Sequence, residues 1–247
     1  MIIGNCRIAI VVPVRNEEGN VSQLIKSFKL SGIDNSNIFI IEGNSSDQTY
    51  DELIRHNSKL DNKFKIMQQI FKGKFGATKT FLMHEESKKF THVFVWDGDM
   101  TIPFDDNLQL LELARNNPEA FVTGSRFASA LRNRSIPLLN FIGNIFFSIL
   151  WCVLTLSKPI DVLCGSKIAL ISDLNNLPPK LFDLDYYGDI AMLFSAKQNS
   201  RKLLVRKVNY VNRSYGTSNI KPFSGGLRIL LAIFICVWHF RRPKSGH

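Results

Sequence analysis

Two aspartates one residue apart, Asp97 and Asp99, have the residue type and the spacing of a cation site. They follow the apolar run 91–96, which has the composition of a buried strand. Carboxylate oxygens are the ligands that Mg²⁺ and Mn²⁺ prefer, and such a cation can bridge a substrate pyrophosphate. Ligands of open α/β sheets bind at the carboxyl ends of strands, which suits this position. The alternative is an ordinary Asp-Gly turn that caps the next helix.

Strand-like and helix-like segments alternate along the chain and would position these aspartates. Short β-branched runs predict strands at 7–14, 37–41, 64–69, 91–96, 120–123, 161–171 and 202–210. Helical patterns and capping residues predict helices at 20–30 (capped by Asn20), 46–56 (capped by Ser46 and Asp47), 76–88, 105–116 and 188–200. This alternation predicts an α/β fold, Rossmann-like, with a mostly parallel central sheet flanked by helices.

Segment 135–157 contains no charged residue and is long enough to be a transmembrane candidate. Asn140, Asn144 and Ser148 recur at i, i+4 and i+8, which places a polar stripe on one helical face. A single crossing would also separate Asp99 from the acidic motif that follows later in the chain. We therefore expect a helix or helical hairpin that packs on the domain or dips into one leaflet. A plain core helix is the alternative.

Segment 227–240 predicts a second apolar helix of about 14 residues, flanked by Arg228, Arg241 and Arg242. An apolar body with basic ends is typical of an interfacial helix, and a dimer contact is the structural alternative. The expected organisation is a catalytic domain at 1–222, which includes 135–157, followed by a basic interfacial helix at 223–247.

The composition narrows the class of protein. With 247 residues and 45% hydrophobic content, the chain can bury the core of one large α/β domain. The net charge of +10 favours an anionic partner, but no nucleic-acid module signature occurs. Four cysteines lie far apart without a Cys-x-x-Cys pair, which argues against a zinc site or a disulfide framework. Together with the absence of a signal-peptide pattern, this favours the cytoplasm.

Further motifs follow the other predicted elements in order: VPVRNEE (12–18), EGNSSDQT (42–49), GKFGA (73–77), GSR (124–126), DVLCG (161–165), GD (188–189) and RSYGTS (213–218). In this order and spacing the series resembles glycosyltransferase family 2 of the GT-A fold. Within that family it looks most like the branch of dolichol-phosphate mannose synthases and bacterial polyprenyl-phosphate glycosyltransferases. The resemblance covers about 7–219.

The resemblance implies a role for each matching position. The nucleoside pocket would be lined by Pro13, Val14, Arg15 and Glu17. Glu42 would contact the base. Lys74 and Gly76 would lie near the nucleotide. Asp97 would face the ribose and the metal, and Asp99 would ligate the divalent cation, Mg²⁺ or Mn²⁺.

Four later residues complete the implied site. Arg126 would meet a donor or acceptor phosphate, and Asp189 would be the catalytic or acceptor-orienting carboxylate. Arg213 and Ser218 would belong to a mobile loop that closes over the pyrophosphate. The chain lacks the Gln-x-x-Arg-Trp motif of processive synthases, which favours a single transfer over polymerisation.

The residues and the resemblance together predict a metal-dependent inverting glycosyltransferase. It would move one hexose from a UDP- or GDP-sugar to a lipid-linked acceptor, plausibly polyprenyl phosphate, as a peripheral protein on the cytoplasmic face of a membrane. Metal and basic groups would stabilise the departing diphosphate, and Asp189 would serve the acceptor. The apolar helices are also compatible with a homo-oligomer.

Three alternatives remain. A family 2 enzyme with a soluble or glycan hydroxyl acceptor would make the apolar helices structural. A nucleotide-sugar-binding scaffold without turnover is favoured only by two departures from the family pattern: Glu42 stands where relatives usually have Asp, and Asp189 stands where many members have Glu. A sugar nucleotidyltransferase is disfavoured because no Gly-rich phosphate loop follows the first strand.

Overall fold

The computed structural model describes residues 6–133, 136–177, 181, 188–216 and 222–241. In this part of the chain a seven-stranded sheet has the order β3-β2-β1-β4-β6-β5-β7. Only β6 among these strands runs opposite to its neighbours. The strands are β1 (Ile8–Val14), β2 (Ile38–Glu42), β3 (Lys65–Gln68), β4 (His92–Val95), β5 (Phe121–Ser125), β6 (Lys167–Leu170) and β7 (Leu203–Lys207). The predicted α/β fold with a mostly parallel sheet is confirmed.

Helices cover both faces of the sheet because successive strand residues point to opposite sides. In β1, Ala9 and Val11 enter one core, whereas Ile10 and Val12 enter the other. The second core includes α1 (Glu18–Leu30), α2 (Thr49–Asn57) and α4 (Phe104–Arg115). The first core includes α3 (Lys74–Met83), α6 (Leu138–Thr155), α7 (Ile171–Asn175), α9 (Gly188–Gln198) and α10 (Pro222–Arg241). The short helices η1 (Asn35–Asn37), η2 (Glu85–Lys89) and α5 (Phe127–Asn133) complete the described elements.

Several predicted element boundaries are wrong. Helix α1 begins before Asn20, and the Asn20 side chain contacts Glu17 and Ser214 instead of capping the helix. Helix α3 begins at Lys74 and ends at Met83, and η2 follows as a separate short helix. The predicted strand 161–171 is reduced to β6, because its first half forms a loop that contributes to the cavity described below.

The described part of the uncharged segment 135–157 contains a single helix, α6 (Leu138–Thr155), rather than a helical hairpin. Its polar stripe faces the protein, since Asn144 and Ser148 are buried together with Phe147 and Trp151. By length and composition α6 would be able to cross a membrane, but 22% of it is buried inside the molecule. The burial of this face agrees with the prediction of a helix that packs on the domain.

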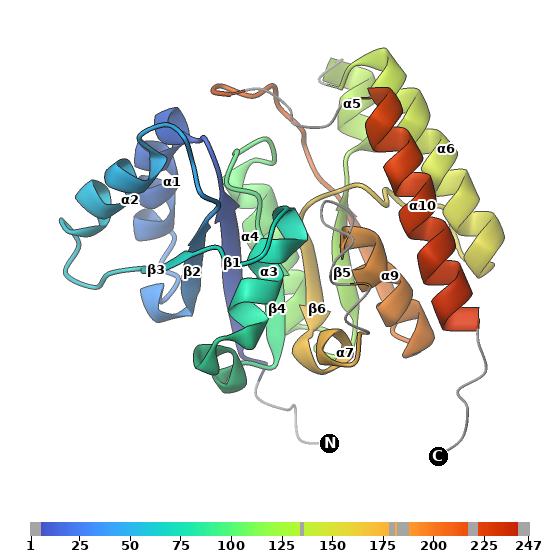
Figure 1. Ribbon diagram of the computed structural model, residues 1–247, viewed down its shortest axis with the longest axis horizontal. Helices are drawn as coiled ribbons and strands as arrows, with labels where there is room; N and C mark the ends of the chain where they lie inside the picture. Colours follow the sequence, from blue (N-terminus) through green and yellow to red (C-terminus); the bar gives the residue numbers. More distant parts are fainter. Residues whose placement is uncertain (1–5, 134–135, 178–180, 182–187, 217–221, 242–247) are drawn as a thin grey trace.

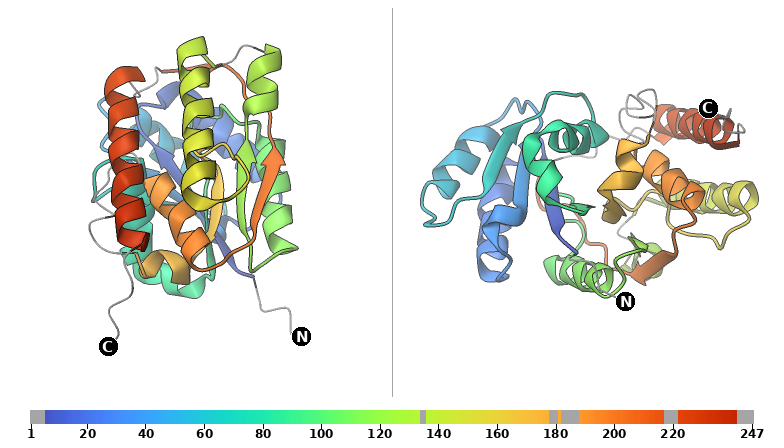
Figure 2. Two further views of the ribbon diagram at one scale, coloured as in Figure 1. Left: turned by 90° about the vertical axis from the view of Figure 1, so that its right-hand side faces the viewer. Right: turned by 90° about the horizontal axis from the view of Figure 1, so that it is seen from below.

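Helix α10 is longer than the predicted 14 residues, because it begins at Pro222 and spans 20 residues. Proline is favoured in the first helical turn, where its missing N–H costs nothing. Ile229, Ala232, Ile233 and Cys236 of α10 are buried in the core. Figures 1 and 2 show α10 beside α6 and α9, at the edge of the molecule opposite α1 and α2.

Candidate active site

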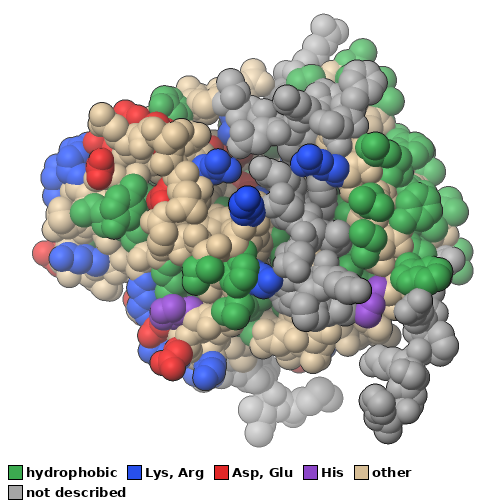
Figure 3. All heavy atoms as spheres, in the orientation of Figure 1, with side chains coloured by type: hydrophobic (Ala, Val, Ile, Leu, Met, Phe, Trp, Pro, Cys, Tyr) green, Lys and Arg blue, Asp and Glu red, His purple; other side chains and the backbone are tan. Residues whose placement is uncertain are grey.

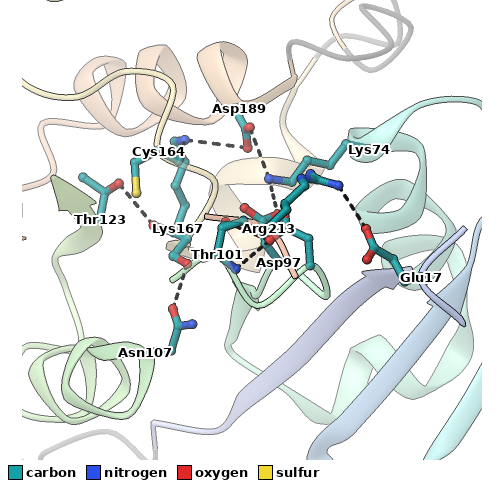
Figure 4. Close-up of polar contacts among 12 residues, drawn as sticks. Glu17, Lys74, Asp97, Thr101, Asn107, Thr123, Cys164, Lys167, Asp189 and Arg213 are labelled. Carbon is teal, nitrogen blue, oxygen red and sulfur yellow. Dashed lines mark hydrogen bonds and ion pairs between the residues drawn. The ribbon is translucent and has the colours of Figure 1, made fainter. Parts of the chain in front are cut away.

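A cavity of about 680 Å³ opens beside the carboxyl ends of β1 and β4. Residues that are far apart in the sequence line it. The predicted site residues among them are Pro13, Val14, Arg15, Glu17, Lys74, Asp97, Asp99, Arg126, Asp189 and Arg213. The cavity therefore brings both aspartates of the acidic pair together with Asp189 and with basic side chains from four other segments. Figure 4 shows Asp97, Lys74, Asp189 and Arg213 close together.

The two carboxylate oxygens of Asp99 make different contacts. Oδ1 accepts hydrogen bonds from the Thr101 backbone N–H (3.0 Å) and hydroxyl (2.8 Å), which is the turn that the sequence also allowed. Met100, inside this turn, has a positive φ of 55°. Oδ2 pairs with the Arg213 guanidinium. The turn thus fixes the Asp99 side chain and directs one oxygen toward a cation.

Asp97 pairs with the Lys74 ammonium at the start of α3. Burial raises the pKa of the Asp97 carboxyl, but the charge of Lys74 lowers it more, so that it lies below the usual value. Burial lowers the pKa of Lys74, and the charges of Asp97 and Asp189 raise it above its ordinary value. Both groups are therefore charged at neutral pH.

Gly165 makes the close approach of two loops possible at this pair. A Cβ at this position would collide with the Asp97 carboxylate and with the Lys74 ammonium. Only glycine therefore lets the 161–166 loop pack against Asp97 and Lys74 without displacing their side chains.

Asp189, in the first turn of α9, lies between two lysines. Its Oδ2 is 3.8 Å from the Lys74 Nζ, and its Oδ1 is 3.7 Å from the Nζ of Lys167 on β6. Lys74 thereby connects Asp97 to Asp189. The predicted acceptor carboxylate lies within one side chain of the predicted metal site.

Arg126 forms a bidentate ion pair with Asp161, with Nε–Oδ2 at 2.7 Å and Nη2–Oδ1 at 2.8 Å. Burial lowers the pKa of the guanidinium, and Asp161 raises it above its usual value. The guanidinium also lies over the Tyr210 ring, with Cζ 5.3 Å from the centroid. Arg126 lines the cavity, but Asp161 already balances its charge, which makes it a weaker phosphate ligand than a free arginine.

The segment that carries Arg213 is docked on the start of α1. Arg213 Nη1 donates to Glu17 Oε1 at 3.2 Å, and the Ser214 hydroxyl donates to Asn20 Oδ1 at 2.9 Å. Gly19 faces the Tyr215 ring so closely that a Cβ there would collide with it. Ser218, the other residue of the predicted closing loop, lies outside the described residues.

Two predicted nucleotide residues do not line the cavity. Glu42 is buried, and its carboxylate accepts from the backbone N–H groups of Asn44 and Ser45 and from the Gln68 amide. It fixes the loop after β2, so any effect on a base would pass through Asn44. Gly76 packs against the carbonyl of Phe71, where a Cβ would collide.

Other cavity residues were not predicted from the sequence. They include Asn44, Gln69, Phe71, Thr101, Tyr210 and Ile229. Asn44 has a positive φ of 55°, and an Asn two residues after a strand was the only sequence signal for it. The apolar and aromatic residues carried no signal, because such types usually belong to a core.

The donor set of the cavity suits a divalent cation that is shared with a substrate. Asp97 and Asp99 supply hard carboxylate oxygens, and no cluster of three or more acidic, histidine or cysteine side chains occurs among the described residues. Mg²⁺ is usually held by one or two carboxylates together with substrate phosphates and water. Lys74 pairs with Asp97 and Arg213 pairs with Asp99. A bound divalent cation would supply the same two positive charges.

Glu17 gives a pH-dependent prediction. Burial raises the pKa of its carboxyl to about 7, against the opposing effects of Asn20 and Arg213. A raised folded-state pKa contributes stability that is complete below about 4.5, the unfolded value, and is lost as the pH rises through 7. Between pH 5 and pH 8 the wild type should therefore lose roughly 2.5 kcal/mol of unfolding free energy relative to Glu17→Gln. Urea unfolding at both pH values measures this difference.

The control for this prediction is Glu112→Gln, a change at an exposed carboxylate on α4. This variant measures the effect of losing one exposed carboxylate, against which the effect of Glu17→Gln is compared. Parallel curves for wild type and Glu17→Gln would contradict the assignment of a raised pKa to Glu17.

The family model described as glycosyl transferase family 2 matches residues 9–166, which is more than half of the chain and includes both aspartates of the acidic pair. The chain belongs to this family. It is a glycosyltransferase, as the motif series predicted, and the fold is GT-A. The narrower dolichol-phosphate mannose synthase branch stays a prediction. None of the curated proteins searched matched this chain.

Solved structures of glucosyl-3-phosphoglycerate synthase from Mycobacterium tuberculosis are similar to this glycosyltransferase. The complex with Mn²⁺, UDP and glucosyl-3-phosphoglycerate is 17% identical, covering 98% of this chain and 82% of that chain, with a TM-score of 0.67. The complex with Mn²⁺, UDP-glucose and phosphoglyceric acid is 16% identical over the same shares, with a TM-score of 0.67. The complex with Mg²⁺ and UDP is 16% identical over the same shares, with a TM-score of 0.66. At this identity the similarity shows the fold.

Proposed function

We propose that this glycosyltransferase moves a single hexose from a nucleoside diphosphate sugar to a phosphate-bearing lipid acceptor at a membrane surface. The observation that carries the transfer is the convergence of Asp97, Asp99 and Asp189 with Lys74 and Arg213 in one cavity. The exposed face of α6 and α10 supports the lipid acceptor.

The cavity offers separate groups for the two demands of glycosyl transfer. The bond between the anomeric carbon and the diphosphate oxygen breaks, its electron pair leaves with the diphosphate, and an acceptor oxygen bonds to the same carbon. A divalent cation at Asp97 and Asp99 would neutralise charge on the departing diphosphate. Lys74 and Arg213, which now pair with these aspartates, are positioned to exchange onto the diphosphate oxygens.

Asp189 faces the same cavity and serves the acceptor. For a hydroxyl acceptor it would take the proton, whereas for a phosphate anion it needs only to orient the attacking oxygen. Attack from the side opposite the diphosphate inverts the anomeric carbon. We therefore place the leaving diphosphate beside Asp97 and Asp99, and the acceptor beside Asp189.

The donor is proposed to be a UDP-sugar, with Mn²⁺ or Mg²⁺ as the metal and a GDP-sugar as the alternative. The similar synthase binds UDP with either metal and binds UDP-glucose with Mn²⁺. In this chain the loop after β2, held by Glu42, and Asn44 and Gln69 line the part of the cavity where a base would lie.

The lipid acceptor rests on an apolar face formed by α6 and α10 (Figure 3). Its exposed large side chains are Leu138, Leu139, Ile142, Ile145, Phe146, Ile149 and Val153 on α6, and Leu227, Leu231, Phe234 and Trp238 on α10. Exposed apolar patches of this kind mark protein or membrane contacts. Trp238 is 64% exposed, and tryptophan is enriched at membrane interfaces.

Charge and position both favour an anionic lipid surface over a second copy of the chain. Every charged residue after Asp189 is lysine or arginine, and no acidic residue occurs between Glu119 and Asp161. Two copies that both carry this basic excess would repel each other, whereas anionic lipid attracts it. Ile229 of α10 lines the cavity while the opposite side of that helix is exposed, so a lipid phosphate at this face lies near the site.

A soluble acceptor is the second candidate. The similar synthase binds phosphoglyceric acid, a soluble compound that carries a phosphate. A cavity with Arg126, Lys74 and Arg213 in its lining also suits such an acceptor. Both candidates share the phosphate, and the phase in which the product appears distinguishes them.

The test uses vesicles that contain polyprenyl phosphate and a labelled nucleotide sugar, with Mn²⁺. The variant Phe234→Ser/Trp238→Ser should lower organic-phase product at least about tenfold, because it removes apolar membrane contacts. Its release of nucleoside diphosphate with a water-soluble acceptor should not change. The matched control is Leu30→Ser/Ile54→Ser, which changes two exposed apolar residues on α1 and α2. Aqueous product with no organic-phase label in the wild type would contradict the lipid acceptor.

A further inference from the structure

Lys167 is a buried cation that the motif series did not single out. It is the first residue of β6, and its side chain is 0% exposed. Its Nζ donates to the Cys164 carbonyl and lies 3.7 Å from Asp189 Oδ1. Because burying an ammonium is costly unless it is paired and hydrogen-bonded, these two contacts stabilise it. Its charge also helps to lower the pKa of Asp97 and that of Asp161, so Lys167 interacts with three carboxylates.

The backbone around Lys167 is held firmly. The Ser166 hydroxyl donates to Asn107 Oδ1 at 2.7 Å, and the Ser166 carbonyl accepts from the Thr123 hydroxyl (3.2 Å) and from the Gly124 N–H (3.3 Å). Figure 4 shows Asn107 and Thr123 near Lys167. Ser166 is itself fully buried. The origin of the lysine side chain is therefore fixed by both β5 and α4.

The two lysines beside Asp189 differ in what they can do when substrate enters. Lys74 lines the cavity and also pairs with Asp97, so a metal and a diphosphate would compete for it. Lys167 is sealed from solvent, is not part of the cavity lining, and keeps the Cys164 carbonyl as a second partner. The contact of Asp189 with Lys74 can therefore be exchanged for a contact with substrate, whereas the contact with Lys167 is kept.

We infer that Lys167 is a positioning residue for Asp189: it holds Oδ1 from behind and leaves Oδ2 directed at the acceptor when Lys74 turns to the donor diphosphate. This inference rests on the proposed role of Asp189 in transfer. Lys167 touches neither substrate, so its removal should affect the chemical step and not donor binding.

The test is a double-mutant cycle of Lys167→Met and Asp189→Asn in the full chain. Lys167→Met should lower kcat about tenfold to a hundredfold, the cost expected for a misplaced catalytic group. Its KM for the nucleotide sugar and its Mn²⁺-dependent affinity for UDP should stay within about threefold of wild type, because the direct ion pair of Asp97 is with Lys74, which is unchanged, and Lys167 acts on Asp97 only through its charge. In the Asp189→Asn background, Lys167→Met should lower kcat no further.

An equal kcat for Lys167→Met and wild type, or the same loss in both backgrounds, would overturn the inference. Thermal unfolding of the four proteins gives a readout that does not depend on a substrate. Each single variant should have a lower Tm than wild type, and the double variant should have a Tm above that of Lys167→Met, since Lys167→Met takes one of its two lysine partners from the Asp189 carboxylate and Asp189→Asn removes the charge that needs them. A double variant no more stable than Lys167→Met would also overturn it.

The two proposals fail in different ways. A wild type that transfers sugar to no acceptor refutes the proposed function, and the Tm cycle still measures the Lys167–Asp189 coupling. If Lys167→Met does not fold, the double variant decides: its failure to fold shows that Lys167 acts on packing and not through Asp189.

Discussion

Asp99→Ala is expected to lower kcat/KM for sugar transfer about a thousandfold or more at saturating Mn²⁺. The substitution removes the Asp99 carboxylate, whose Oδ2 faces the cavity and pairs with Arg213. It leaves Arg213 without its partner and removes half of the proposed metal ligands. Initial rates of nucleoside diphosphate release, with each donor tested, measure the effect.

Asp99→Asn separates the metal from the turn. The amide oxygen still accepts from the Thr101 N–H and hydroxyl, as Oδ1 does now, but the negative charge is gone. We expect a loss of activity close to that of the alanine variant, with a Tm near wild type. The control is Asp61→Ala, a change at an exposed loop aspartate outside the cavity. Full activity of Asp99→Asn would show that the turn, and not the metal, is what this residue supplies.

Gly165→Ala is expected to lower transfer about tenfold to a hundredfold, since small misplacements of reacting groups have effects of this size. The added methyl group would collide with the Asp97 carboxylate and the Lys74 ammonium, and both are flexible ends that can move away. The fold should therefore survive while the acidic pair is displaced. Weaker Mn²⁺-dependent UDP binding should accompany the loss of rate.

The matched control is Gly143→Ala on α6, where a Cβ would meet nothing within 4 Å. This variant should keep full activity and gain slightly in stability, because alanine favours a helix by about 1 kcal/mol over glycine. A Gly165→Ala enzyme with wild-type rate and wild-type UDP affinity would contradict the assigned positions of Asp97 and Lys74.

Much of the fold follows from local sequence patterns. The alternation of β-branched runs with helical segments predicted the sheet, and the resemblance to the family implied which side chains would share the cavity. Asp97 lies at the cavity because it follows β4, in line with the rule that ligands bind at the carboxyl ends of parallel strands. Arg213 reaches the same cavity because its segment docks on the start of α1.

Partner identities could not be predicted in the same way. Arg126 pairs with Asp161 across 35 positions of sequence, and nothing in either motif specifies that the arginine is balanced by a carboxylate. Lys167 is an ordinary lysine by type and would normally be exposed. Its burial depends on β6 running antiparallel between β4 and β5, which no local pattern indicates.

Tertiary contacts also decided the misplaced boundaries. Asn20 has the residue type of a helix cap, but α1 begins earlier, and Asn20 instead links Glu17 to Ser214. The 161–166 loop is apolar enough for a strand, yet it turns at the cavity, where Gly165 lies against the side chains of Asp97 and Lys74.

The most direct test of the central claim is the release of nucleoside diphosphate from a panel of nucleotide sugars, with Mn²⁺ or with EDTA, in the presence of polyprenyl phosphate or phosphoglyceric acid. We predict release from one donor, dependent on metal and on one of the two acceptors, and none from Asp99→Asn. Release that persists in EDTA, or no release from any donor with either acceptor, would contradict a metal-dependent transfer at this cavity.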